Sequence, residues 1–362
     1  MTKVYQFAAF FIVFLAIYLG IHFYVFFRMY DLFYLKKSTG LIILISLLAL
    51  SFPLFSILER FHHSAITRGL YIMSATWVGV MAFLFTSLLV FELIRLFFKN
   101  IDTITSGMVI IFIVIFLAIV SIVNAYYIET KHIVIPMKNL EKNMTLVQIS
   151  DVHLGTIHNV HFLRRIVEKT NNVNPDAVLI TGDLFDGGGA LNGEISALLN
   201  QFKAETFFTT GNHERYVGLD NAMTILNKTK IRILNNAAVD YRGLQIVGVE
   251  DTYDDFSRPD DFISRIPMNK SLPTVLMYHQ PTGVKEANEA GIDLQLSGHT
   301  HDGQFFPFNL VVMGLTRYSN GLYDYNGTKI YVTSGTGTWG PPMRLFSRNE
   351  IVVVHLVPKS SS

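Results

Sequence analysis

The chain has 362 residues, of which 50% are hydrophobic and 16% are charged. Soluble domains carry about 25% charged residues, so this composition argues against a disordered chain, a coiled coil or a nucleic-acid-binding protein. The formal net charge of +1 is too balanced to point to a polyanion as the main partner. The absence of cysteine excludes disulfide bridges, zinc-thiolate sites and a cysteine nucleophile.

Four long apolar runs occupy the first 127 residues. They cover residues 4–27, 41–58, 71–98 and 107–127. A membrane-spanning helix needs about 20 residues, so we predict an N-terminal transmembrane region of four helices over residues 1–127. Buried soluble helices are the alternative, but such helices alternate polar and apolar faces and these runs do not. Glu92 and Arg95, three residues apart in the third run, are expected to pair on one face of its helix.

Short apolar strands followed by polar residues dominate the rest of the chain. The expected strands are 145–150, 177–181, 206–210, 244–249, 274–278, 294–297, 329–333 and 350–357, with helices expected over 162–171 and 194–202. Helices between the early strands indicate βαβ units, while the later strands resemble hairpins. We therefore predict a C-terminal α/β domain over residues 143–362, made of two packed β-sheets flanked by helices. A linker is expected over residues 128–142.

Polar residues at the strand ends form the candidate site. They occur as Asp151-Val152-His153, Gly182-Asp183, Gly211-Asn212-His213-Glu214, His279 and Gly298-His299-Thr300-His301. Open α/β sheets build their sites at the carboxyl edge of the strands, so these side chains are expected to converge. Carboxylate, amide and imidazole ligands without thiolate suit Mn²⁺, Fe or Zn²⁺, and there are enough for two ions. Two metals bridged by a carboxylate, for which Asp183 is the natural candidate, can activate a water for attack at phosphorus.

In this order, the five motifs resemble those of the calcineurin-like metallophosphoesterases over residues 143–357. The resemblance implies that one metal is bound by Asp151, His153, Asp183 and His301, and the second by Asp183, Asn212, His279 and His299. It also implies that His213 faces the substrate phosphate and stabilises the transition state or protonates the leaving oxygen. Glu214 either orients His213 or is a solvated loop carboxylate. His158 is expected at the surface.

Within this family, the later motifs resemble membrane-attached phosphoesterases that act on lipid-linked phosphates. These motifs are Ser297–Gln304, Gly321–Tyr323, Ser334–Gly337, Pro341–Arg344 and Glu350–Ile351. Arg344 is predicted to contact the substrate phosphate, with an ordinary surface arginine as the alternative. Asp302, where that subgroup often has glycine, adds negative charge beside the metals or caps a turn. The apolar stretch over residues 305–313 docks on lipid or forms a buried strand and turn.

A further resemblance is to the UDP-2,3-diacylglucosamine hydrolases of lipid A synthesis. It implies cleavage of that substrate to UMP and 2,3-diacylglucosamine 1-phosphate, although a four-span anchor departs from the usual form of those enzymes. The implied cofactors are two divalent ions, manganese first, with iron or zinc as alternatives. The implied partners are the lipid-linked substrate and the bilayer, with the catalytic domain on the cytoplasmic side of a bacterial-type inner membrane. The counts of basic residues on the two sides of the spans leave the orientation open.

Two other functions stay open. One is a broader membrane-bound phosphodiesterase or pyrophosphatase that acts on other lipid-linked phosphates. The other is a non-catalytic membrane scaffold that keeps the phosphoesterase fold. The complete ligand set argues against a scaffold, because degenerate members of an enzyme family are expected to lose ligands.

Overall fold

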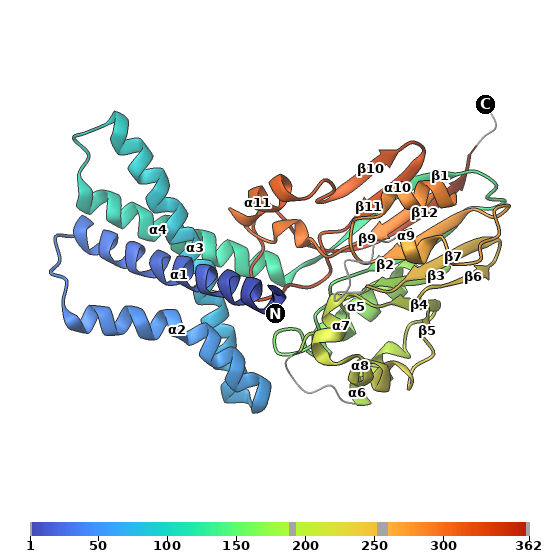
Figure 1. Ribbon diagram of the computed structural model, residues 1–362, viewed down its shortest axis with the longest axis horizontal. Coiled ribbons are helices and arrows are strands. Elements are labelled where there is room, and N and C mark those ends of the chain that lie inside the picture. The colour runs from blue at the N-terminus through green and yellow to red at the C-terminus, as the bar shows by residue number, and fades with distance from the viewer. Residues whose placement is uncertain (1, 188–192, 252–259, 360–362) are drawn as a thin grey trace. The chain divides into compact units, whose positions relative to one another are not determined.

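The computed structural model describes residues 2–187, 193–251 and 260–359 (Figure 1). The chain divides into two compact units. One unit contains Met1–Ile122 with Pro341–Met343, and the other contains Val123–Gly340 with Arg344–Ser362. The second unit therefore holds every residue that the sequence assigns to the candidate site.

The first unit is built from four helices, α1 (Thr2–Leu32), α2 (Thr39–Phe61), α3 (Ala65–Phe97) and α4 (Thr103–Tyr126). Serines fix two of the helix starts, because Ser38 Oγ accepts a hydrogen bond from the Leu41 N–H at 3.2 Å and Ser64 forms a reciprocal capping pair with Thr67. α2, α3 and α4 are long and apolar enough to cross a membrane, as predicted for three of the four runs. The first predicted span falls in α1, and a fourth crossing stays a prediction.

Charged side chains in this unit pair with one another. The predicted pair of Glu92 and Arg95 is present, with 3.6 Å between Glu92 Oε2 and Arg95 NH1. Arg28 of α1 also donates to Glu92. Both guanidinium groups lie 5.7 Å from the ring centre of Phe91. Because each charge has a partner of opposite sign, these residues have a structural role among the apolar helices.

The second unit contains two six-stranded sheets, with strand orders β1-β12-β2-β3-β4-β5 and β10-β11-β9-β8-β7-β6 (Figure 1). The first sheet consists of β1 (Ile128–Met137), β2 (Met144–Ile149), β3 (Ala177–Thr181), β4 (Glu205–Thr209), β5 (Arg232–Ile233) and β12 (Asn349–Pro358). The second consists of β6 (Ala237–Tyr241), β7 (Leu244–Val249), β8 (Thr274–Tyr278), β9 (Leu294–Ser297), β10 (Gly321–Tyr325) and β11 (Thr328–Val332). The helices are α5 (Val160–Val173), α6 (Gly193–Leu199), α7 (Asn212–Val217), α8 (Leu219–Leu226), α9 (Asp260–Ile263), α10 (Val284–Ala290) and α11 (Phe308–Leu315), with a 3₁₀ turn η1 (His301–Gly303).

Hydrophobic side chains hold these layers together. One core cluster draws on both sheets, with Leu146 and Phe207 from the first and Ile246 and Val275 from the second. A second cluster packs the first sheet against α5, α6 and α8, and a third packs the second sheet against α9 and α10. Because the central strands are covered on both faces, their sequences are continuous apolar runs rather than alternating ones. The predicted α/β domain of two sheets flanked by helices is confirmed.

The predicted linker over residues 128–142 differs from the structure, because most of it is β1. This strand pairs in parallel with β12 along its whole length, beginning with Ile128 opposite Asn349. Ile128, Ile135 and Met137 are buried, while most residues between them are partly or fully exposed. This pattern of buried and exposed side chains is that of an edge strand, which has one face covered by the core.

The second unit also begins earlier than the predicted C-terminal domain, at Val123. Only Tyr127 separates α4 from β1, and the last turn of α4 belongs to the second unit. The side-chain amide of Asn349 donates to the Ala125 carbonyl at 2.7 Å, and Arg165 of α5 donates to the Tyr126 carbonyl at 2.7 Å. These bonds satisfy carbonyls that the end of a helix leaves without intrahelical partners.

Candidate metal centre

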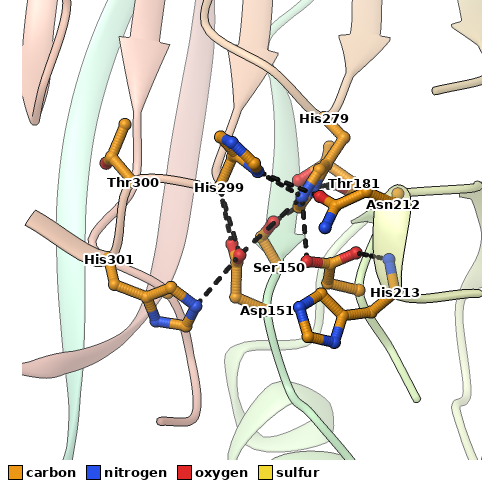
Figure 2. Close-up of polar contacts among 12 residues, drawn as sticks. Ser150, Asp151, Thr181, Asn212, His213, His279, His299, Thr300 and His301 are labelled. Atoms are coloured by element: carbon orange, nitrogen blue, oxygen red, sulfur yellow. Dashed lines mark hydrogen bonds and ion pairs between the residues drawn. The ribbon is translucent and has the colours of Figure 1, made fainter. Parts of the chain in front are cut away.

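The predicted ligands converge where the strands of the two sheets end (Figure 2). Asp151 follows β2, Asp183 follows β3 and Asn212 follows β4, while His279 follows β8 and His299 follows β9. β2, β3 and β4 are parallel, as are β8 and β9, so their carboxyl ends meet at a common edge within each sheet. The sequence order of motifs thus becomes one cluster in space.

The backbone at this cluster is unusual. Five of the seven predicted ligands have a positive φ, namely Asp151, His153, Asp183, His299 and His301, with values from 51° to 72°. Residues with a side chain rarely adopt this left-handed conformation, which costs of the order of 1 kcal/mol each and gathers at functional sites. In this conformation the five side chains point toward a common centre. The hydrogen bonds around them offset the cost of the strained backbone.

One group of ligand atoms comes from Asp151, His153 and His301. The Nε2 atoms of His153 and His301 lie 3.0 Å apart, and Asp151 Oδ1 lies 3.4 Å from His301 Nε2 and 4.0 Å from His153 Nε2. Asp183 Oδ2 approaches the same group at 3.9 Å from His153 Nε2. Ligands about 2.1 Å from a tetrahedral metal are separated by about 3.4 Å, so these spacings fit a divalent ion.

A second group shares Asp183 with the first. Asp183 Oδ2 lies 3.0 Å from His279 Nε2, and His299 Nδ1 lies 3.3 Å from His279 Nε2 and 3.0 Å from Asn212 Oδ1. His279 Nδ1 donates to the Thr181 carbonyl at 2.9 Å, which orients the ring so that Nε2 faces the group. Such an outer hydrogen bond is the usual way a metal-binding histidine is oriented. The donor set therefore fits two ions bridged by Asp183.

The titration of His153, His301 and Asp183 agrees with this donor chemistry, whereas that of His279 does not: burial lowers the pKa of His279, but the carboxylates of Asp183 and Asp151 raise it well above its usual value. Burial, together with the neighbouring histidines, holds the pKa of His153 well below its usual value. Burial and the charge of Arg344 do the same to the pKa of His301. Both imidazoles are therefore neutral at pH 7 and present lone pairs. Burial raises the pKa of Asp183, but the surrounding histidines, led by His279, lower it below its usual value and keep the carboxylate ionised.

Two glycines let the strand-end loops approach the acidic ligands. A Cβ atom on Gly298 would overlap the Asp151 carboxylate, and one on Gly211 would overlap the Asp183 carboxylate. Neither glycine has a positive φ. Their role is therefore to let the backbone approach these carboxylates closely.

His213 stands beside the ligands, as the resemblance implies, but its partner differs from the predicted one. Its Nδ1 lies 3.1 Å from the Asp186 carboxylate, and its ring centre lies 4.5 Å from that of His153. Burial lowers the pKa of His213, but the bond to Asp186 and the carboxylates of Asp183, Asp186 and Glu214 raise it above its usual value. The sequence analysis missed Asp186, although its position three residues after Asp183 on the same loop was a usable signal.

Glu214 matches neither of its two predicted roles. It is fully buried, and no hydrogen bond joins its side chain to the His213 ring among the described contacts. Its Oε2 accepts the N–H groups of Asp183 and Gly211 at 3.0 and 2.7 Å, and its Oε1 accepts those of Leu184 and Phe185 at 2.8 and 3.1 Å. Burial and the Asp183 carboxylate raise its pKa to about 7, against the effect of the N–H groups. Glu214 therefore fastens together the two loops that carry the bridging and amide ligands.

Arg344 is also placed differently from both of its predicted alternatives. Its side chain is fully buried rather than at the surface or facing a phosphate. It donates to the carbonyls of His301, Ser334 and Gly337 at 2.6–2.8 Å, and its Nε donates to Asn349 Oδ1 at 2.8 Å. Every guanidinium nitrogen is occupied within the protein, so we assign Arg344 to positioning the His301 loop.

Two further residues can now be placed. His158 is buried, not at the surface, because its Nε2 accepts the Thr338 N–H at 2.8 Å and its ring stacks on Phe162. The Asp302 carboxylate accepts a hydrogen bond from Asn320 Nδ2 at 3.1 Å. The His158–Thr338 and Asp302–Asn320 hydrogen bonds join residues that are 180 and 18 positions apart in the sequence. Local sequence patterns therefore did not reveal them.

The chain is similar to known proteins over this unit. Residues 144–303 match the model of the calcineurin-like phosphoesterase family. Uncharacterized metallophosphoesterases of Helicobacter pylori strain J99 and Campylobacter jejuni are 38% and 36% identical, over 65% and 68% of this chain. The chain spans 65% of the Helicobacter protein and 68% of the Campylobacter protein. A Danio rerio protein named as a transmembrane protein with metallophosphoesterase domain is 33% identical, over 66% of this chain and 60% of that protein.

Proposed function

The chain belongs to the calcineurin-like metallophosphoesterase family, and from this premise we propose that it hydrolyses a phosphate ester or anhydride with the help of two divalent metal ions. The observation that carries the proposal is the position of Asp183 Oδ2, which lies 3.9 Å from His153 Nε2 of one ligand group and 3.0 Å from His279 Nε2 of the other. A complete donor set around both groups also argues against a non-catalytic scaffold.

The proposed chemistry divides between the metals and the protein. A bound pair of divalent ions supplies an activated water and neutralises charge on the phosphate oxygens. Asp151, His153, Asp183 and His301 would hold one ion, and Asp183, Asn212, His279 and His299 the other. Manganese is our first candidate, since oxygen and imidazole ligands without sulfur suit it, with iron and zinc as alternatives.

His213 is the proposed catalytic residue. The carboxylate of Asp186 fixes the ring through Nδ1, so Nε2 is free to donate to a phosphate oxygen or to the leaving group. The raised pKa of His213 favours the protonated ring that such donation requires. Asp186 has the part of the orienting carboxylate that the sequence analysis had considered for Glu214.

For the substrate, we propose a lipid-linked phosphate, and UDP-2,3-diacylglucosamine as its specific form. The products would be UMP and 2,3-diacylglucosamine 1-phosphate. Three helices apolar enough to cross a membrane support a substrate that resides in the bilayer. The resemblance of Ser297–Gln304 and the later motifs to enzymes of lipid-linked phosphates supports it as well. This substrate requires a cytoplasmic catalytic unit on a bacterial-type inner membrane, and other lipid-linked phosphates are the alternative.

Hydrolysis by the detergent-purified full chain tests both levels of the proposal. The assay compares UDP-2,3-diacylglucosamine with bis(p-nitrophenyl) phosphate, in Mn²⁺ and in excess chelator. Metal-dependent release of UMP supports the specific substrate. Cleavage of the chromogenic diester alone keeps the dinuclear enzyme and rejects the lipid A substrate. No cleavage of either compound by protein that contains metal contradicts the proposed activity.

A further inference from the structure

Helix α11 exposes its apolar side chains and buries its polar one. Leu310, Met313 and Leu315 are 58%, 62% and 81% exposed, and Phe308 and Val311 are exposed as well. Asn309 is buried, and its side-chain amide donates to the Asp302 carbonyl at 2.6 Å. A helix on the surface of a soluble domain shows the reverse arrangement. The buried strand and turn that the sequence analysis considered for residues 305–313 are not formed.

This helix is continuous with the metal centre. The Asp302 carbonyl that anchors Asn309 directly follows the ligand His301 in the chain. Leu315, at the other end of α11, lines a cavity of about 490 Å³ whose wall also contains the ligand His299. Arg317 and Tyr318 line the same cavity just beyond the helix. Any surface that receives the Leu315 end of α11 therefore lies beside a cavity whose wall includes one of the predicted metal ligands.

The compact unit that contains α11 also contains the end of a candidate membrane span. α4 is long and apolar enough to cross a membrane, and its last turn belongs to the same compact unit as α11. The bonds from Asn349 and Arg165 to the Ala125 and Tyr126 carbonyls tie that turn to β12 and α5. A bilayer that α4 crosses therefore ends next to this unit.

We propose that α11 inserts its apolar face into the interfacial layer of the bilayer and so presents the cavity beside His299 to lipid headgroups. An apolar helix with a basic and an aromatic residue two to three positions after its end, here Arg317 and Tyr318, is typical of such insertion. The link to a lipid-linked substrate rests on the proposed function, whereas the insertion itself does not.

The absence of cysteine from the chain allows a direct test. Single substitutions Val311→Cys and Met313→Cys are labelled with an environment-sensitive fluorophore in the full chain reconstituted in lipid vesicles. Lys228→Cys, an exposed position after α8, is the matched control. The vesicles contain either ordinary lipids or lipids with a spin label on the upper acyl chain, which quenches only fluorophores that reach the acyl region.

Insertion predicts a blue-shifted emission at residues 311 and 313 and loss of about half of it or more in spin-labelled vesicles, with no loss at residue 228. Equal emission in the two kinds of vesicle at 311 and 313 overturns the proposal. Shielding from water without quenching, accompanied by disulfide crosslinks between two chains at residue 311, overturns it in favour of a protein–protein interface. Because the readout needs no turnover, quenching in a chain that hydrolyses no lipid-linked substrate would reject that substrate and keep the insertion.

Discussion

Replacing Glu214 tests whether a buried carboxylate holds the metal loops together. Four backbone N–H groups donate to it, two to each oxygen, at 2.7–3.1 Å. Glu214→Ala leaves all four donors buried without that acceptor. Glu214→Gln keeps one oxygen for two donors and turns an NH₂ group toward the other two. The two variants are therefore expected to differ by about a factor of two in their effect.

The size of the effect follows from the number of donors. A buried donor without a partner costs about 1–3 kcal/mol. At the lower end of this range, Glu214→Ala lowers the free energy of unfolding by about 4 kcal/mol and Glu214→Gln by about 2 kcal/mol. For a domain of this size, 1 kcal/mol corresponds to about 2–4 °C in Tm, so the expected losses are about 8–16 °C and about 4–8 °C.

Thermal unfolding of the purified chain in chelator measures these changes in Tm without any contribution from bound metal. Glu289→Gln is the matched control, because that carboxylate is exposed and lies 3.7 Å from Lys285 in a surface pair worth little. Its Tm is expected to stay at the wild-type value. The reasoning is refuted if Glu214→Ala unfolds at the same temperature as this control.

Three other substitutions separate the roles of neighbouring groups. Asp186→Asn removes a charge-assisted hydrogen bond worth about 1.5–3 kcal/mol from His213, so kcat is expected to fall about 10- to 100-fold with metal content unchanged; loss of metal would contradict this role. Arg344→Met removes the hydrogen bond to the His301 carbonyl and is expected to weaken metal binding about 10-fold in a chelator competition. A raised KM at full metal occupancy would instead support the phosphate contact that the sequence predicts for Arg344. Burial lowers the pKa of His158 to about 3, so the folded state binds fewer protons than the unfolded state between about pH 6.5 and 3. The contribution of His158 to the free energy of unfolding is fully present above pH 6.5, and between pH 6.5 and 3 acidification lowers it by about 1.4 kcal/mol per pH unit. His158→Gln should make the free energy of unfolding depend less steeply on pH in this range. An unchanged slope would show that the His158 ring is not buried in its neutral form.

The ligands could be predicted because their signal is local. Each one follows an apolar strand within a few residues, and parallel strands bring their carboxyl ends together. Asp151, Asp183 and His279 are of this kind. Two sheets were predicted from the helices between the early strands and the hairpin-like spacing of the later ones. The hairpin expectation was wrong for the centre of the second sheet, because β7, β8 and β9 pair in parallel.

The supporting residues could not be predicted because their partners are distant in the sequence. Arg344 bonds the carbonyl of His301, which lies 43 residues earlier, and Glu214 bonds the N–H of Asp183, which lies 31 residues earlier. A charged side chain in a loop is usually solvated, so the predicted alternatives were a phosphate contact or the surface for Arg344, and a contact with His213 or solvent for Glu214. The edge strand β1 was missed for a related reason, because only its pairing with β12 distinguishes it from a polar linker.

The bridging role of Asp183 is the central claim, and metal content measures it most directly. The full chain and its Asp183→Ala variant are equilibrated with Mn²⁺, freed of excess metal and analysed by mass spectrometry, with Asp324→Ala on exposed β10 as the control. The account predicts two ions per chain in the wild type and the control, and loss of both in Asp183→Ala, because Asp183 Oδ2 lies within 3.9 Å of a histidine nitrogen in each ligand group. Two ions retained by Asp183→Ala would contradict it.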